Sequence, residues 1–137
     1  MMSGAGEATG DATGGEGLAI DETDRLIASD KVEGTAVCDR QGESLGSIYT
    51  VMIDKYSGQV AYAVMSFGGF LGLGERYHPV PWKSLEYDSA LGGYVADVGR
   101  EQLEKAPSYT RDEAPWSNPA YGRSVYDHYG MAYPYGV

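Results

Sequence analysis

The stretch "SLGSIYTVMIDKYSGQVAYAVMSF", residues 44–67, holds two runs rich in β-branched, aromatic and other apolar residues, separated by a short polar segment. In the first run apolar side chains fall on both faces of a strand, with Val51 on one face and Ile48 on the other. Such a strand is either central in a sheet or curved around a core, and Gly46 would help it bend. The segment "DKYSG" predicts a hairpin connection to a second strand over residues 59–67.

Further short strands are predicted on both sides of this hairpin. "TAVC" (35–38) precedes it, and "RYHPV" (76–80) follows it; two prolines restrict the second of these to a short or edge strand. "LEYD" and "YVAD" flank the turn "SALGG", and "GREQLEKA" (99–106) predicts a short helix or helical turn. About six short strands joined by hairpin turns predict an all-β protein, a small antiparallel barrel or sandwich, because closure removes exposed edges.

The two ends of the chain differ in composition from this middle. Residues 1–22 consist mainly of Gly, Ala, Thr and acidic residues, so they have little to bury and predict an acidic flexible tail. Residues 108–137 hold six of the twelve tyrosines and Trp116, with no helical or strand period. This second tail is either disordered or docked on a barrel or a partner. The predicted domain therefore covers residues 23–107.

Charge and cysteine content exclude several classes of protein. The 137-residue chain carries a formal net charge of −10, and its basic residues are scattered singly, which disfavours nucleic-acid phosphates and anionic lipid. No apolar run reaches membrane-spanning length, and the first residues lack the pattern of a signal peptide. A single cysteine, Cys38, cannot form an internal disulfide. We therefore expect a cytoplasmic protein with no nucleic-acid partner and no membrane insertion.

The glycine-rich loop of residues 68–74 does not fit a phosphate site. A P-loop needs Lys and then Ser or Thr after its last glycine, whereas Gly74 is followed by Glu75. Tyr77 stands where the third glycine of the dinucleotide fingerprint belongs, and the prolines that follow cannot open a helix. No cofactor is predicted.

Other patterns that suggest catalysis also fail in their context. "GESLG" places Ser44 in a nucleophile-elbow pattern, but here the pattern lies in a predicted turn that leads into a strand. The cysteine lies beside Asp39, which makes a thiol less reactive, and we expect it to be a small core residue. The histidines, His78 and His128, show no metal-ligand spacing with it. No catalytic or metal-binding residue is predicted.

Paired carboxylates are equally uninformative. Glu86 and Asp88 lie on one face of a predicted strand, where solvated charges are far more common than a glycosidase pair. The glycine loop itself is the better candidate site, because apolar residues on a loop often mark an interface. Plugging one end of the barrel is the competing role. The candidate interaction residues are Gly68, Gly69, Phe70, Leu71, Gly72, Leu73, Gly74, Glu75, Pro81 and Trp82.

The chain from about residue 24 to 107 resembles the stand-alone PRC-barrel domain proteins of bacteria. The resemblance is carried by the ordered series G-x-x-L-G-x-I, a hairpin, G-G-F-L-G-x-G-E and P-W-x-x-L. The family is related to the cytoplasmic domain of the photosynthetic reaction-centre H subunit and to the C-terminal domain of the ribosome maturation factor. The resemblance implies a PRC-type β-barrel of about six strands with a short C-terminal helical turn.

The same resemblance implies an adaptor without catalytic residues. We expect it to act through protein–protein contacts, including self-association as a dimer or larger assembly, with a partner that the sequence does not identify. One alternative is a small-ligand or metal-ion binding barrel with Glu75, Tyr77 and His78 at its mouth. Another is an accessory factor in RNA or ribosome processing, which the negative charge disfavours.

Overall fold

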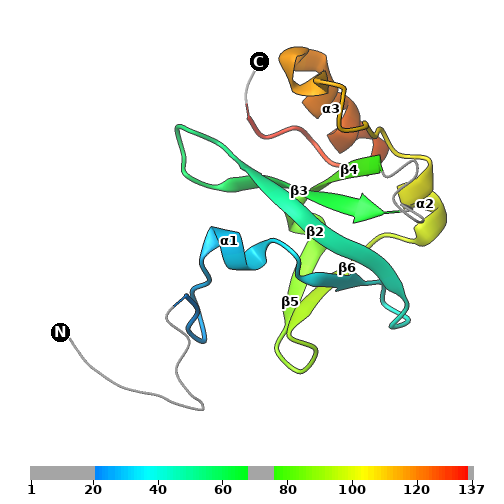
Figure 1. Ribbon diagram of the computed structural model, residues 1–137. Coiled ribbons are helices and arrows are strands. Elements are labelled where there is room, and N and C mark those ends of the chain that lie inside the picture. Colours follow the sequence, from blue (N-terminus) through cyan, green and yellow to red (C-terminus); the bar gives the residue numbers. More distant parts are fainter. Residues whose placement is uncertain (1–20, 68–75, 136–137) are drawn as a thin grey trace. The chain divides into compact units, whose positions relative to one another are not determined.

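The structure is a computed structural model that describes residues 21–67 and 76–135 (Figure 1). These residues belong to two compact units, one ending at Lys31 and the other beginning at Val32. Within the described residues, no helix combines the length and the apolar character that crossing a membrane requires.

The first unit is described only from Asp21 onward, so most of the predicted tail of residues 1–22 lies outside the described residues. A β-bridge joins Glu22 to Ile27. The Lys31 ammonium lies 3.6 Å from a Glu22 carboxylate oxygen and 3.7 Å from one of Asp21. The short helix α1 (Ser29–Val32) spans the boundary between the two units.

The second unit is built on a six-stranded sheet that curls into a half-barrel (Figure 1). Its strands are β1 (Ala36–Cys38), β2 (Ser44–Ile53), β3 (Val60–Phe67), β4 (Arg76–Pro81), β5 (Leu85–Asp88) and β6 (Gly93–Ala96). Their order in the sheet is β4-β3-β2-β1-β6-β5. The prediction of a small six-stranded β-barrel fold is confirmed.

Strand β2 lies in the interior of the sheet, as its two apolar faces predict. Leu45 and Ile48 are buried, and the strand pairs with β1 on one side and β3 on the other. Gly46 adopts φ 135°, and a Cβ at this position would overlap the carbonyl oxygen of Ser66 on β3. Only glycine fits both the backbone conformation and the close approach of the neighbouring strand.

One strand pair departs from the predicted antiparallel arrangement. β1 pairs with β6 in parallel, with Val37 opposite Tyr94 and Cys38 opposite Val95. A short polar turn could not make this pairing, because parallel neighbours need a long crossover connection. Here strands β2 to β5 form the connection between β1 and β6. A pattern of consecutive hairpins therefore predicts the remaining strand pairs of the sheet but not the pairing of β1 with β6.

Strand β4 is an edge of the sheet, as its prolines predict. Among the described strands it pairs with β3 alone, with Pro79 opposite Val64 and Pro81 opposite Tyr62, and on its other side a single β-bridge joins Tyr77 to Tyr109. Because proline has no N–H to donate, it is tolerated where one side of a strand needs no ladder. A short 3-10 helix, η1 (Trp82–Ser84), follows directly and leads into β5 at the other edge.

The core of the second unit is mainly aliphatic. Its most deeply buried side chains come from β1 to β4, from the short helix α2 (Arg100–Glu104) that was predicted, and from the C-terminal region. The largest of them are Leu45, Ile48, Met65, Leu103, Val37, Val64, Val80 and Val125.

The C-terminal region is folded, with a short 3-10 helix η2 (Pro115–Ser117) and the helix α3 (Pro119–His128). The sequence pattern predicted no helix here, and on this point the prediction is wrong. Asn118 caps α3 by accepting a hydrogen bond from the Ala120 N–H at 3.0 Å, and a proline occupies the first helical position. The limits at residues 22 and 107 stay predictions.

Candidate interaction surface

The predicted interaction loop falls mostly outside the described residues, which exclude 68–75. Of its ten residues, the structure describes Pro81 and Trp82. Pro81 is buried at the end of β4, and Trp82 is half-buried with its ring 5.3 Å from that of Tyr94. The role of the loop therefore stays a prediction.

Two residues of the alternative ligand site are described, and both are buried. His78 and Tyr77 are 4% and 3% exposed, respectively, and Glu75 lies outside the described residues. The His78 ring packs edge-on against Phe67 at 5.3 Å. Burial lowers the pKa of His78, against the opposing effect of a hydrogen bond to the Leu103 backbone. His78 thus behaves as a neutral core residue, not as a group at an open mouth.

The other chemically suggestive residues are spread over separate elements. Ser44 opens β2, exposed, and its carbonyl oxygen accepts a hydrogen bond from Arg100 at 2.7 Å; no helix follows it, as an elbow would require. Cys38 is half-buried at the end of β1 rather than fully in the core. His128, at the end of α3, contacts the Gln102 carbonyl oxygen at 2.8 Å. Among the described residues, no three His, Cys, Asp or Glu side chains group as metal ligands.

The acidic residues near the turns have structural partners. Asp39, although acidic, is buried because one of its carboxylate oxygens accepts the N–H groups of Gln41 and Glu43, both at 2.9 Å. Asp88 accepts the N–H of Ala90 at 2.9 Å in the β5–β6 turn. These are turn-forming contacts of the kind that Asp makes after a strand.

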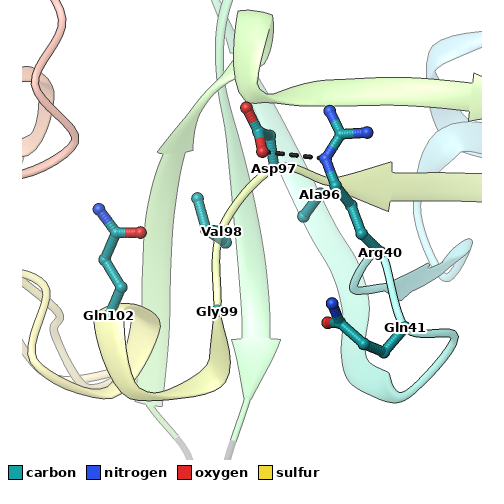
Figure 2. Close-up of a pocket in the computed structure, with 7 residues that line it drawn as sticks. All are labelled: Arg40, Gln41, Ala96, Asp97, Val98, Gly99 and Gln102. Carbon is teal, nitrogen blue, oxygen red and sulfur yellow. Dashed lines mark hydrogen bonds and ion pairs between the residues drawn. The ribbon is translucent and has the colours of Figure 1, made fainter.

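A polar hollow of about 290 Å³ lies beside the β1–β2 turn (Figure 2). Arg40 and Gln41 line it from that turn, and Gln102 lines it from α2. The remaining lining residues are Ala96, Asp97, Val98 and Gly99. The Arg40 Nε lies 2.9 Å from an Asp97 carboxylate oxygen, and this hydrogen bond and the Asp97 charge raise the pKa of Arg40. Both side chains remain mostly exposed.

The sequence left open whether the C-terminal region docks on the barrel; in the structure this region meets β3, through a helix that was not predicted. We call residues 115–135, which comprise η2, α3 and the segment after it, the C-terminal cover. The helix α3 lies beside β3 and β4 (Figure 1). Val125 and Tyr126 of α3 form a buried cluster with Ala61 and Tyr62 of β3. The Tyr126 hydroxyl donates a hydrogen bond to the Ala61 carbonyl oxygen at 2.9 Å.

Aromatic rings dominate this contact. The Tyr62 ring lies 5.0 Å from that of Trp116 and 5.3 Å from that of Tyr126. Tyr133 extends the series at 5.4 Å from Tyr126, and Trp116 contacts Tyr121 at 5.2 Å. Most of these pairs are edge-on or tilted, which is the arrangement that the ring quadrupoles favour.

Some of the buried tyrosine hydroxyl groups in this aromatic contact lack hydrogen-bond partners among the described residues. In the described part of the chain, the buried hydroxyls of Tyr121 and Tyr129 have no hydrogen-bond partner. Burial raises the pKa of Tyr121 to about 12 and raises those of Tyr62, Tyr126 and Tyr129 further. The cover is therefore held mainly by apolar packing, with few polar bonds to fix it.

An apolar hollow of about 170 Å³ opens where the cover meets the β2–β3 hairpin. It is lined by Met52, Ile53, Asp54, Ala61, Tyr62, Trp116, Tyr133 and Tyr135. Ile53, which lines the hollow, is 50% exposed, and Tyr56, in the turn of the same hairpin, is 99% exposed. Large apolar groups on adjacent elements make this the described surface with the strongest character of a protein contact.

The fold is that of a small β-barrel module. The family model of the PRC-barrel domain matches residues 24–103, and the chain belongs to this family. A search of curated proteins gave no match.

Among solved structures, the chain is similar to a 16S ribosomal RNA processing protein, RimM, from Pseudomonas aeruginosa. The two are 21% identical, with a TM-score of 0.38, over 62% of this chain and 51% of the RimM chain. The chain thus spans about half the length of that protein, and a likeness of this degree carries no argument about function.

Proposed function

We propose that the protein is a non-catalytic adaptor that acts through protein–protein contacts, including contacts with a second copy of itself. The observation that carries the proposal is a pair of exposed large side chains on the β2–β3 hairpin: Ile53, which lines the apolar hollow, and Tyr56 in the turn that follows. A tyrosine that is 99% exposed contributes nothing to its own fold, whereas tyrosines are enriched among the residues that dominate binding energy.

The experiment is sedimentation velocity over a wide concentration range, comparing the full chain with the double variant Ile53→Ser/Tyr56→Ser. We expect the average mass of the wild-type chain to rise with concentration, and the variant to associate at least tenfold more weakly. The matched control is Leu91→Ser, on the β5–β6 hairpin, because Leu91 is also exposed, at 59%. This role for the hairpin would be contradicted if the wild-type chain stays monomeric at every concentration, or if the control variant loses as much association as the double variant.

The glycine loop stays part of the proposal as a second contact. If Leu71 lies at a contact surface, Leu71→Asp leaves a folded chain of smaller assembly size. If it plugs the barrel, the same change unfolds the domain, because it buries an unpaired charge. Circular dichroism combined with light scattering on this one variant separates the two roles.

Small-anion binding is a second candidate, favoured by the polar hollow of Figure 2. The Arg40 guanidinium and two amide side chains could bind a carboxylate or phosphate, against the repulsion of the Asp97 carboxylate that pairs with Arg40 in the same hollow. A thermal-shift screen of small anions tests it, with Arg40→Gln expected to abolish any shift and Lys83→Gln, at an exposed site away from the hollow lining, expected to keep it. No stabilisation by any anion would exclude this candidate.

A further inference from the structure

We propose that the β3 surface formed by Ala61 and Tyr62 is a docking site for an aromatic C-terminal helix, and that a second copy of the chain can supply this helix in place of the chain's own α3. The inference deepens the proposed self-association and rests on it. The exchanged element is the C-terminal cover, residues 115–135, and the docking site on β3 is occupied by the cover of a second copy.

The first argument is that the seat of α3 is specific. Val125 is fully buried and Tyr126 is 2% exposed, and the tyrosine hydroxyl bonds to the backbone of β3. Gly122 lies directly against the Tyr62 hydroxyl, which a Cβ at that position would overlap. A helix with glycine at one position and Val-Tyr three residues later fits this surface, and the chain itself carries such a helix.

The second argument is that this seat is incompletely bonded. Two buried hydroxyls of the cover, those of Tyr121 and Tyr129, lack a hydrogen-bond partner in the described part of the chain. A buried polar group without a partner lowers the stability of the contact that buries it. The cover is therefore held by a free energy smaller than its apolar contact would suggest, which makes release and re-docking accessible.

The third argument is the connection between barrel and cover. Tyr109 is fixed to β4 by two backbone hydrogen bonds with Tyr77, of 2.8 and 3.0 Å. A turn then follows, in which the Glu113 N–H donates to the Thr110 carbonyl oxygen at 3.0 Å. This turn returns the chain so that the Trp116 indole donates to the Tyr109 hydroxyl at 3.3 Å.

The turn at residues 110–113 is therefore the hinge of the exchange. If it opens, the cover of one copy can reach the barrel of another while every contact beneath α3 is kept. Exchange of an identical element is a low-cost route to dimers, because the exchanged contacts are the same in both states.

The first test removes the hinge from the full chain. Deleting residues 111–113 takes away the turn that closes the cover onto its own barrel, so the intramolecular competitor is lost. We expect dimerisation at least about tenfold tighter by sedimentation velocity, since a short flexible connection gives an effective concentration in the millimolar range. The control Asp112→Ala keeps the length of the turn and the Glu113 carboxylate, which accepts the Thr110 N–H at 2.8 Å, and should behave as the wild type. A shortened chain that stays monomeric would overturn the exchange.

The second test supplies the helix as a synthetic peptide of residues 115–135. The full-chain variant Val125→Asp expels its own α3, and the peptide should then raise its melting temperature by several degrees. The control peptide carries the same Val125→Asp substitution and should have no effect. Should the Val125→Asp chain not fold, Gly122→Ala, in which the added Cβ overlaps the Tyr62 hydroxyl, serves in its place. No stabilisation by the wild-type peptide would overturn the docking site.

The two proposals fail in different ways. Suppose that the wild-type chain associates, that the hairpin variant does not, and that the shortened chain dimerises no more tightly than the wild type. This combination of results would support the adaptor role and exclude the exchange. A wild-type chain that never associates would exclude self-association itself, whatever the peptide does.

Discussion

The interior of the barrel and the contact beneath the C-terminal cover bury apolar surface in different ways. The interior is filled by aliphatic side chains such as Val64 and Val80, on strands whose backbone groups pair along the sheet. The cover is filled by tyrosines, each of which takes a hydroxyl group into the contact. Aliphatic side chains need only close packing, whereas buried tyrosine hydroxyls also need hydrogen-bond partners, and in the described part of the chain those of Tyr121 and Tyr129 have none. We therefore expect the barrel to be the more stable region and the cover to open first.

The largest effect should come from the barrel. Leu45→Ala empties a position on β2 that is 2% exposed, and large-to-small changes of this kind cost about 2–5 kcal/mol. Denaturant unfolding should show a single transition at much lower denaturant. A loss below about 1 kcal/mol would mean that the barrel is as loosely packed as the cover.

A comparable truncation in the cover should have a smaller and local effect. Val125→Ala shortens a fully buried side chain of α3 and should cost roughly 1–3 kcal/mol. Hydrogen exchange should speed up in the amides of α3 while those of β2 and β3 stay protected. Equal acceleration in β2 would show that the cover and the barrel unfold as one unit.

Single hydroxyl groups provide a finer comparison within the cover. Tyr126→Phe leaves the Ala61 carbonyl oxygen without this donor and should cost about 1 kcal/mol. Tyr129→Phe is the matched control, because its hydroxyl has no partner in the described part of the chain, and should be neutral or slightly stabilising. Thermal unfolding of the two variants side by side measures the difference. Equal losses would mean that the Tyr129 hydroxyl is bonded in solution.

The smallest expected effect is a pH dependence that belongs to the barrel. Burial lowers the pKa of His78 below its ordinary value of 6.5, so below pH 6.5 the unfolded chain binds a proton that the folded chain does not. Stability contributed by the neutral ring should therefore decline as the pH falls through 6.5 toward the folded pKa. Denaturant melts between pH 7 and 5 should show this slope, and His78→Met should flatten it. If the variant shows the same slope of stability against pH, the pH dependence belongs to groups other than His78.

Much of the fold could be predicted, because its signals are local. The run from Ser44 to Ile53 became β2 at the predicted limits, and the turn at "SALGG" joins two strands as its glycines indicate. The edge position of β4 followed from proline chemistry alone. The parallel pairing of β1 with β6 could not be read in this way, because it depends on how the whole sheet curls rather than on any one segment.

The helix of the cover was missed for a different reason. Gly122 and the tyrosines of α3 have modest helix propensity, so tertiary packing decides its conformation. One local signal was present, since Asn118 followed by Pro119 is a helix start. Gly122 makes sense only with Tyr62 beside it, and that contact joins residues 60 positions apart in the sequence. The burial of His78 was likewise invisible in a strand that also contains Arg76.

The placement of the two tryptophans gives each region its own optical reporter. Trp82 sits in η1 of the barrel with its ring 5.3 Å from Tyr94, whereas Trp116 sits in η2 of the cover, 5.0 Å from the Tyr62 ring. At such separations light absorbed by tyrosine is re-emitted from the neighbouring tryptophan. Release of the cover would interrupt this energy transfer at Trp116 and redden its emission, while Trp82 would continue to emit as before. Without any attached dye, the intrinsic fluorescence of the chain distinguishes a barrel with its cover closed from one with its cover open.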